Sequence, residues 1–205
     1  VDPTWLHRYF PAVSERVADL TTATCHYKPI FGAGDSEAHA LRSVARFGEL
    51  TVDPHGGCKT VSYPREEQIY VILGGNGILH YGHETVPVRK DDFMYLPPSI
   101  AHTVSNTSAQ PLRLVVMGFK IPGNVQISSP SKLRLANIED VKEQTVRGHP
   151  SSVLYKLLLG PRAGTRDRID AAYVVTSLFW MDFAPGGTNF PHHHEVAEEI
   201  YLVLD

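Results

Sequence analysis

Apolar and polar residues interchange along most of the first 120 positions, in a pattern that predicts short β-strands. The segment Leu41–Phe47 is one example. Six more such segments are separated by turns rich in glycine and proline: Gln68–Leu73, Gly77–Tyr81, Thr85–Arg89, Asp92–Leu96, His102–Ser105 and Leu112–Phe119. Strands this short, at such close and regular intervals, are typical of an antiparallel sandwich or barrel. We therefore expect an all-β fold.

The pattern changes after residue 120. Residues 121–152 read as a linker with a short helix at Asn137–Thr145, and strand character returns at Val153–Leu159 and Tyr173–Phe183. A second short helix is expected at Ser14–Leu20, which begins with a residue suited to a helix N-cap. The predicted organisation is an N-terminal arm, a first domain, a linker and the start of a second domain, at residues 1–23, 24–120, 121–152 and 153–205.

The second domain repeats the first at a constant offset of 131 residues (185 − 54 = 131). Pro54 corresponds to Pro185, and Ile69-Tyr70 corresponds to Ile200-Tyr201, without a gap. A repeat of this length indicates two copies of a whole domain, because the units of solenoid proteins are shorter.

A group of potential metal ligands lies near the end of the chain. His192 and His194 are two residues apart, so an extended backbone places both imidazoles on one face, and the carboxylate of Glu199 follows closely. Two imidazoles and one carboxylate suit a divalent transition metal that keeps a position open for substrate or water. Mn, Fe, Ni and Zn all accept this ligand set. The alternative is a polar loop without a metal.

Composition limits the partners. The formal net charge of −3 provides no basic surface, so we expect neither nucleic acid nor anionic membranes as partners, and no apolar run is long enough to span a bilayer. Cys25 and Cys58 are far apart, form no CxxC pair and are expected to be two buried or semi-buried thiols. The sequence starts without Met, so a cytoplasmic location is only slightly favoured over export with a removed leader.

The spacing from Gly186 to Glu199 follows the motif G-x5-H-x-H-x3–4-E-x6-G, through His192 and His194. In the first half, Pro97, His102 and Asn106 hold their places in a second motif, G-x5-P-x-G-x2-H-x3-N, while Asp91 and Ser99 replace its glycines. By these motifs the chain resembles the cupins, and by its repeat it resembles a bicupin. The resemblance implies two β-barrels of the jelly-roll (double-stranded β-helix) type, the second of them incomplete.

The resemblance also implies that the first barrel is free of metal. Val61, Tyr63 and Gln68 stand where the motif has its two histidines and its glutamate, and His102 alone would hold an ion poorly. We expect His102 to be hydrogen-bonded to Tyr63 or Gln68. These three polar side chains would then line a first-barrel pocket for a small ligand.

For the second barrel the resemblance implies His192, His194 and Glu199 as ligands, with Glu198 as the alternative third ligand and a fourth His near position 233. It implies a metal-dependent enzyme acting on a small molecule, such as a dioxygenase, an isomerase, a decarboxylase or an amidohydrolase resembling ureidoglycine aminohydrolase. The alternative is a non-catalytic module for binding, sensing or oligomerisation. A homodimer is expected, because exposed edge strands tend to be covered.

Overall fold

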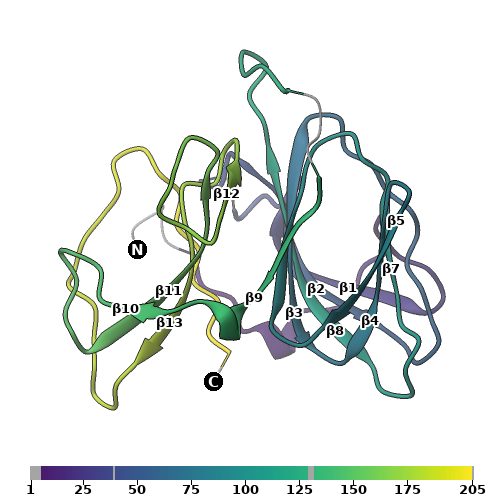
Figure 1. The fold of residues 1–205 in the computed structure, drawn as a ribbon, viewed down its shortest axis with the longest axis horizontal. Coiled ribbons are helices and arrows are strands. Elements are labelled where there is room, and N and C mark those ends of the chain that lie inside the picture. The colour runs from purple at the N-terminus through teal and green to yellow at the C-terminus, as the bar shows by residue number, and fades with distance from the viewer. Residues whose placement is uncertain (1–5, 39, 129–131, 205) are drawn as a thin grey trace.

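The computed structural model describes residues 6–38, 40–128 and 132–204, and its regular structure is almost entirely β-strand. Figure 1 shows two groups of strands side by side, which we call the first unit (residues 24–120) and the second unit (residues 138–204). No α-helix occurs in the described residues, and none of their helices could cross a membrane. The expected all-β fold is confirmed.

Two antiparallel sheets build the first unit. The larger sheet contains, in spatial order, β1 (Cys25–Gly32), β2 (Val44–Val52), β8 (Leu112–Lys120), β3 (Glu66–Gly74) and β6 (Asp92–Leu96), and β9 (Arg134–Asn137), from outside the unit, is added at its edge. The smaller sheet contains β5 (Glu84–Arg89), β4 (Asn76–Tyr81) and β7 (His102–Ser105). β9 comes from the expected linker and pairs with β6. The six strands predicted between residues 68 and 119 are confirmed.

The large sheet of the first unit is buried on both faces. Neighbouring residues of a strand point to opposite faces, and both Tyr70 and Ile69 of β3 are almost fully buried. Tyr70 packs in the core between the two sheets of the first unit. Ile69 packs in a second core, which includes Leu158 and Ile169 of the second unit. The central strands are therefore nearly continuous in apolar residues, and the two units share a core.

The second unit is a smaller sheet around β11 (Val153–Pro161). β11 pairs antiparallel with β10 (Glu143–Gln144) and β13 (Leu178–Phe183), and parallel with β12 (Ile169–Ala172). The last strand was expected to begin at Tyr173, which was wrong. The backbone N–H groups of Tyr173–Val175 donate to the carboxylate of Glu67 instead of to a neighbouring strand.

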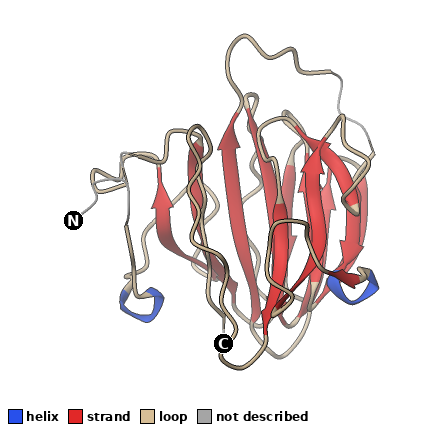
Figure 2. Cartoon of the chain, turned by 90° about the vertical axis from the view of Figure 1, so that its left-hand side faces the viewer, coloured by secondary structure: helices blue, strands red, loops and turns tan. Residues whose placement is uncertain are grey.

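Both helix predictions were wrong. The structure has two single 3-10 turns, η1 (Phe10–Ala12) and η2 (Ile138–Asp140), drawn as helices in Figure 2. After η2, the backbone enters β10 and pairs with β11. Within Ser14–Leu20, the N–H of Arg16 donates to the carbonyl of Tyr27 in β1. In both places, pairing with a strand uses the backbone groups that a helix would need.

The two units share the details of one strand pair. In β1 and β2 the register shifts between Pro29 and Phe31, and in β11 and β13 it shifts between Leu157 and Leu159. Corresponding residues of β1 and β11 are 128 positions apart in the sequence (157 − 29 = 128). Corresponding residues of β2 and β13 are 131 positions apart (179 − 48 = 131). The turns η1 and η2 are also 128 residues apart (138 − 10 = 128). The connection between the paired strands is thus three residues longer in the second unit.

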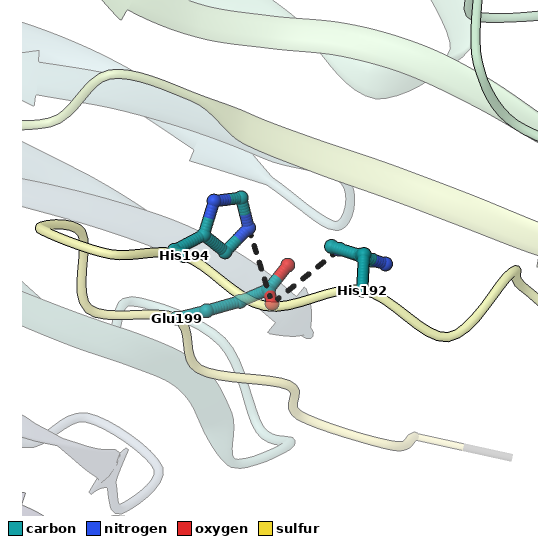
Figure 3. Close-up of side chains that lie close together, drawn as sticks. All are labelled: His192, His194 and Glu199. Atoms are coloured by element: carbon teal, nitrogen blue, oxygen red, sulfur yellow. Dashed lines mark ion pairs between the residues drawn. The ribbon is translucent and has the colours of Figure 1, made fainter.

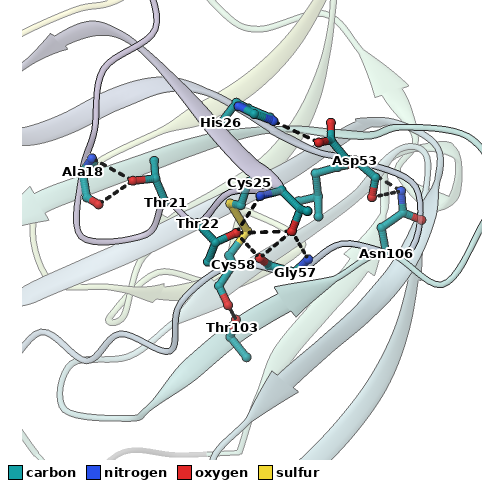
Figure 4. The surroundings of a disulfide bond; sticks show 12 residues. Ala18, Thr21, Thr22, Cys25, His26, Asp53, Gly57, Cys58, Thr103 and Asn106 are labelled. Atoms are coloured by element: carbon teal, nitrogen blue, oxygen red, sulfur yellow. Dashed lines mark hydrogen bonds and ion pairs between the residues drawn. A yellow bond between two sulfur atoms is a disulfide. The ribbon is translucent and has the colours of Figure 1, made fainter.

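A disulfide joins Cys25 to Cys58, so the expectation of two thiols was wrong. Figure 4 shows the bond at the start of β1, beside the loop that carries Gly57. Thr22 holds this loop, because its hydroxyl donates to the carbonyl of Gly57 at 2.6 Å. The Cα atoms of the two cysteines are 5.1 Å apart. Their 33-residue separation in sequence gives no sign of this contact.

Candidate metal centre

The structure brings His192, His194 and Glu199 together in the segment after β13 (Figure 3). One potential ligand atom from each lies within 4.8 Å of the other two. Oε2 of Glu199 is 3.5 Å from Nε2 of His194 and 3.8 Å from Nε2 of His192. All three residues are exposed, and the segment is not paired as a strand. Their role as ligands stays a prediction.

Local hydrogen bonds orient two of these side chains. Nδ1 of His192 lies 2.8 Å from the carbonyl oxygen of Phe190, and because a carbonyl only accepts, Nδ1 carries the proton. Nε2 of His192 is the ring nitrogen that faces Glu199. The hydroxyl of Tyr201 donates to Oε1 of Glu199 at 2.9 Å, which leaves Oε2 for the imidazoles. Partners of this kind fix the tautomer and orientation of metal ligands.

Glu198, the alternative third ligand, points elsewhere. Its carboxylate accepts hydrogen bonds from the backbone N–H groups of Arg42 at 2.6 Å and Ser43 at 3.0 Å, next to the start of β2. This arrangement mirrors Glu67, which lies 131 residues earlier (198 − 67 = 131) and binds the backbone of 173–175. Each unit thus holds a loop of the other with an equivalent carboxylate. Glu199 is the carboxylate that faces the imidazoles.

His149 is a neighbour of the cluster that the sequence did not reveal, because it belongs to no motif. Its ring is nearly perpendicular to that of His192, with centroids 5.8 Å apart. Nδ1 of His149 lies 2.8 Å from Oδ1 of Asn189 and 3.0 Å from the hydroxyl of Tyr155. Burial raises the pKa of Tyr155, so its hydroxyl stays protonated. The cluster therefore has a polar wall on the side of β11.

A surface cavity adjoins the cluster and has a volume of about 610 Å³. His194 and Glu199 line it together with the aromatic side chains of Phe179 and Trp180 from β13. Burial raises the pKa of Tyr201, which also lines it, to about 12. A cavity with an apolar wall and a few polar groups suits a small organic molecule.

In the first unit, the expected partner of His102 was wrong. Nδ1 of the buried His102 donates to the carbonyl of Ile100 at 2.9 Å, and Nε2 accepts from the hydroxyl of Tyr70 at 3.1 Å. Tyr70 and Gln68 are two residues apart in β3, so their side chains point to the same face of the sheet. Of the two, Tyr70 is the one that contacts His102. The ring of Tyr63 lies next to His102, with centroids 6.0 Å apart. Burial lowers the pKa of His102, which keeps the ring neutral.

The hydroxyl of Tyr63 is hydrogen-bonded to two charged side chains, Arg46 and Asp19, contacts that the sequence did not reveal. It accepts from Nη1 of Arg46 at 2.7 Å and donates to Oδ2 of Asp19 at 2.8 Å. Burial alone would lower the pKa of Arg46, but Asp19, Tyr63 and Glu66 together raise it above its ordinary value, so the guanidinium stays charged. The side-chain N–H of Gln68 donates to Glu66 at 3.0 Å, while Oε1 of Gln68 is buried without a partner.

Comparisons with known proteins agree with this fold. The family model of the cupin domain matches residues 48–118. An uncharacterised protein of Methanocaldococcus jannaschii is 32% identical over 65 residues, which are 31% of this chain and 52% of that protein. The chain therefore aligns with about half the length of this curated relative.

Among solved structures, bacterial pirin from Escherichia coli in complex with nickel(II) is similar with a TM-score of 0.61 and 15% identity, covering 84% of this chain and 69% of that chain. A predicted oxalate decarboxylase from Thermotoga maritima is similar with a TM-score of 0.50 and 15% identity, covering 57% of this chain and all of that one. At this identity the likeness concerns the fold. With its two antiparallel sheets and the match at residues 48–118, the first unit contains a cupin domain.

Proposed function

We propose that this cupin binds a divalent transition metal through His192, His194 and Glu199 and acts on a small molecule in the adjoining cavity. One observation carries the proposal: three potential ligand atoms lie within 4.8 Å of one another. The hydrogen bonds of His192 and Glu199 support it, since they leave the facing atoms free to bind a metal. A bound ion would act there as a Lewis acid or activate water or O2.

The fold does not choose among the reactions expected above, namely those of a dioxygenase, an isomerase, a decarboxylase or an amidohydrolase. Mn, Fe, Ni and Zn all suit two imidazoles and a carboxylate. The nickel in the pirin structure belongs to that protein, and it supports only the proposal that this fold can hold such an ion.

We also propose that the chain has the tandem architecture of a bicupin. The shared register shift and the equivalent carboxylates of Glu67 and Glu198 support two copies of one domain. β2 pairs with β8 on its second edge, whereas β13 pairs only with β11 in the described part of the chain. A further strand on β13 would complete the copy. Light scattering would show whether the chain forms the homodimer in which a second molecule can supply that strand.

The test of the metal site compares neighbouring histidines. His192→Ala and His194→Ala should each lower the bound metal per chain at least tenfold after dialysis, measured by elemental analysis, because either change removes a ligand. His193→Ala is the matched control, since it removes an imidazole between the two proposed ligands and should keep the metal. Equal metal content in all three variants would refute the site.

The alternative is a module that binds a small molecule without catalysis. The first unit supports this alternative, because Tyr63 stands at the place of a motif histidine and is hydrogen-bonded to Arg46 while the fold persists. Metal-loaded protein that turns over none of a panel of small carboxylates, flavonoids and ureido compounds would support this alternative.

A further inference from the structure

A largely buried cation lies inside the first unit. The guanidinium of Arg46, on β2, is covered by the ring of Tyr63 at 4.1 Å from the ring centroid, and its side chain is 14% exposed. Nη1 donates to Oδ1 of Asp19 at 2.9 Å, and Nη2 lies 3.4 Å from Oε2 of Glu66. A buried charge is expensive unless it is paired, so these contacts account for part of its placement.

The surroundings of Arg46 have spare hydrogen-bonding capacity. Within the described residues, Nε of Arg46, the hydroxyl of Tyr27 and Oε1 of Gln68 are buried without a partner. Tyr27 is only 6% exposed, and its hydroxyl interacts electrostatically with both Arg46 and Asp19. Such atoms are rare in proteins, so a group of them marks a place where a polar molecule can bind. Two of the three groups can donate, which favours a hydrogen-bond acceptor as that molecule.

The equivalent positions of the second unit show what Arg46 replaces. The offset of 131 residues places Ser177 at the position of Arg46, and His194 and Glu199 at the positions of Tyr63 and Gln68 (46 + 131 = 177). In the second unit, Ser177 lines the same cavity as the potential ligands His194 and Glu199. The first unit has Tyr63 and Gln68 at the ligand positions and carries a cation of its own.

We propose that the first unit binds a small carboxylate, with Arg46 as the fixed cation and with Tyr27 and Tyr63 as hydrogen-bond donors. Asp19, from the arm that precedes β1, occupies this site as an internal carboxylate. It already accepts hydrogen bonds from both Arg46 and Tyr63. An incoming carboxylate takes over these two bonds and adds the hydroxyl of Tyr27, which Asp19 leaves without a partner.

The site is accessible from the surface. A cavity of about 750 Å³ is lined by Asp19, Tyr27 and Arg46, and the arm supplies part of its wall, including Ala12 and Ser14. The side chain of Asp19 is 47% exposed, although Arg46 beneath it is not. The side chain of Asp19 can therefore turn toward solvent and leave the site while its neighbour Leu20 stays in the core.

The test is a competition between Asp19 and acetate, measured by calorimetry on protein freed of metal with a chelator, so that the second unit does not contribute. Asp19→Ala should bind acetate at least tenfold more tightly than the wild-type protein, because the variant frees the donors of Arg46 and Tyr63. Chloride at equal ionic strength should not substitute. Glu37→Ala is the matched control, since it removes a carboxylate from the rim of the same cavity and should behave as wild type.

Tyr27→Phe separates a binding role from a structural one. The hydroxyl of Tyr27 has no partner, so its removal should leave the thermal midpoint unchanged. In the Asp19→Ala background it should weaken acetate binding about tenfold, the effect expected for a hydrogen bond to a charged group. Equal acetate affinity of Asp19→Ala and wild type would overturn the proposal, as would equal affinity with and without the Tyr27 hydroxyl. The metal test on His192 has its own readout, so either proposal can fail alone.

Discussion

The two units build the same strand pair and use it for different chemistry. β1–β2 and β11–β13 have the same register and the same shift, yet the residues that follow them differ. In the first unit, Tyr63 is tied to a buried arginine, whereas the equivalent His194 is exposed next to Glu199. The register depends on backbone pairing and on the buried faces of the strands. Residues that face the interior from adjoining loops can therefore change without disturbing it.

The largest effect is expected when the first unit is given the potential metal ligands of the second unit. We expect the combined variant with Val61→His, Tyr63→His, Gln68→Glu and Arg46→Ser to bind about one more metal ion per chain, because it restores two imidazoles and a carboxylate near His102. Elemental analysis measures the gain. The same variant with Arg46 retained is the control and should gain no ion, since a guanidinium beside the ligands repels one. An extra metal ion in both variants would show that Arg46 does not prevent metal binding.

The disulfide is a second difference, because Val153 and Asn189 stand at the equivalent positions of the second unit (25 + 128 = 153; 58 + 131 = 189). Replacing both cysteines, Cys25→Ser with Cys58→Ser, should lower the free energy of unfolding by roughly 4 kcal/mol, from the entropy of the freed loop. Urea unfolding followed by circular dichroism measures it. A reductant should destabilise the wild type similarly and leave the double variant unchanged. Equal midpoints would mean that the loop is held by its other contacts.

The equivalent carboxylates Glu67 and Glu198 differ in burial. Glu67 is fully buried and also accepts from the hydroxyl of Tyr95, whereas Glu198 is exposed. Glu67→Ala should cost about 3 kcal/mol of stability, because it leaves several buried donors unpaired, and Glu198→Ala about 1 kcal/mol. Urea unfolding distinguishes them. Similar losses would show that burial does not separate the two contacts.

The smallest expected effect is a dependence on pH in the first unit. Burial lowers the pKa of His102 below its ordinary value of 6.5, so the unfolded chain binds a proton more readily than the folded protein. This residue therefore makes stability fall as the pH drops below about 6.5. His102→Gln should reduce that slope in unfolding experiments between pH 7 and pH 5, in the range set by the ordinary pKa. An unchanged slope would assign the dependence to other groups.

The sequence predicted what depends on local pattern. The strands of the first unit follow from alternation and turns, and the spacing of His192, His194 and Glu199 is enough to find a group that the fold brings together. It did not predict the contacts of Arg46 with Asp19, 27 residues away, or the disulfide across 33 residues. Pairs of this kind depend on which segments the fold brings together. The helices failed for the same reason, since strand pairing outweighed local preference.

The position of Glu198 links the two units in one further respect. It is the neighbour of Glu199 in the chain, and it holds the backbone of Arg42 and Ser43, three to four residues before Arg46. A short path of covalent and hydrogen bonds therefore runs from one proposed site to the other. If a ligand at either end shifts this path, the affinity at the other end must change by the same factor, because such coupling is reciprocal. The contact that fastens the units together is thus also the place where a variant would reveal coupling between the two proposed sites.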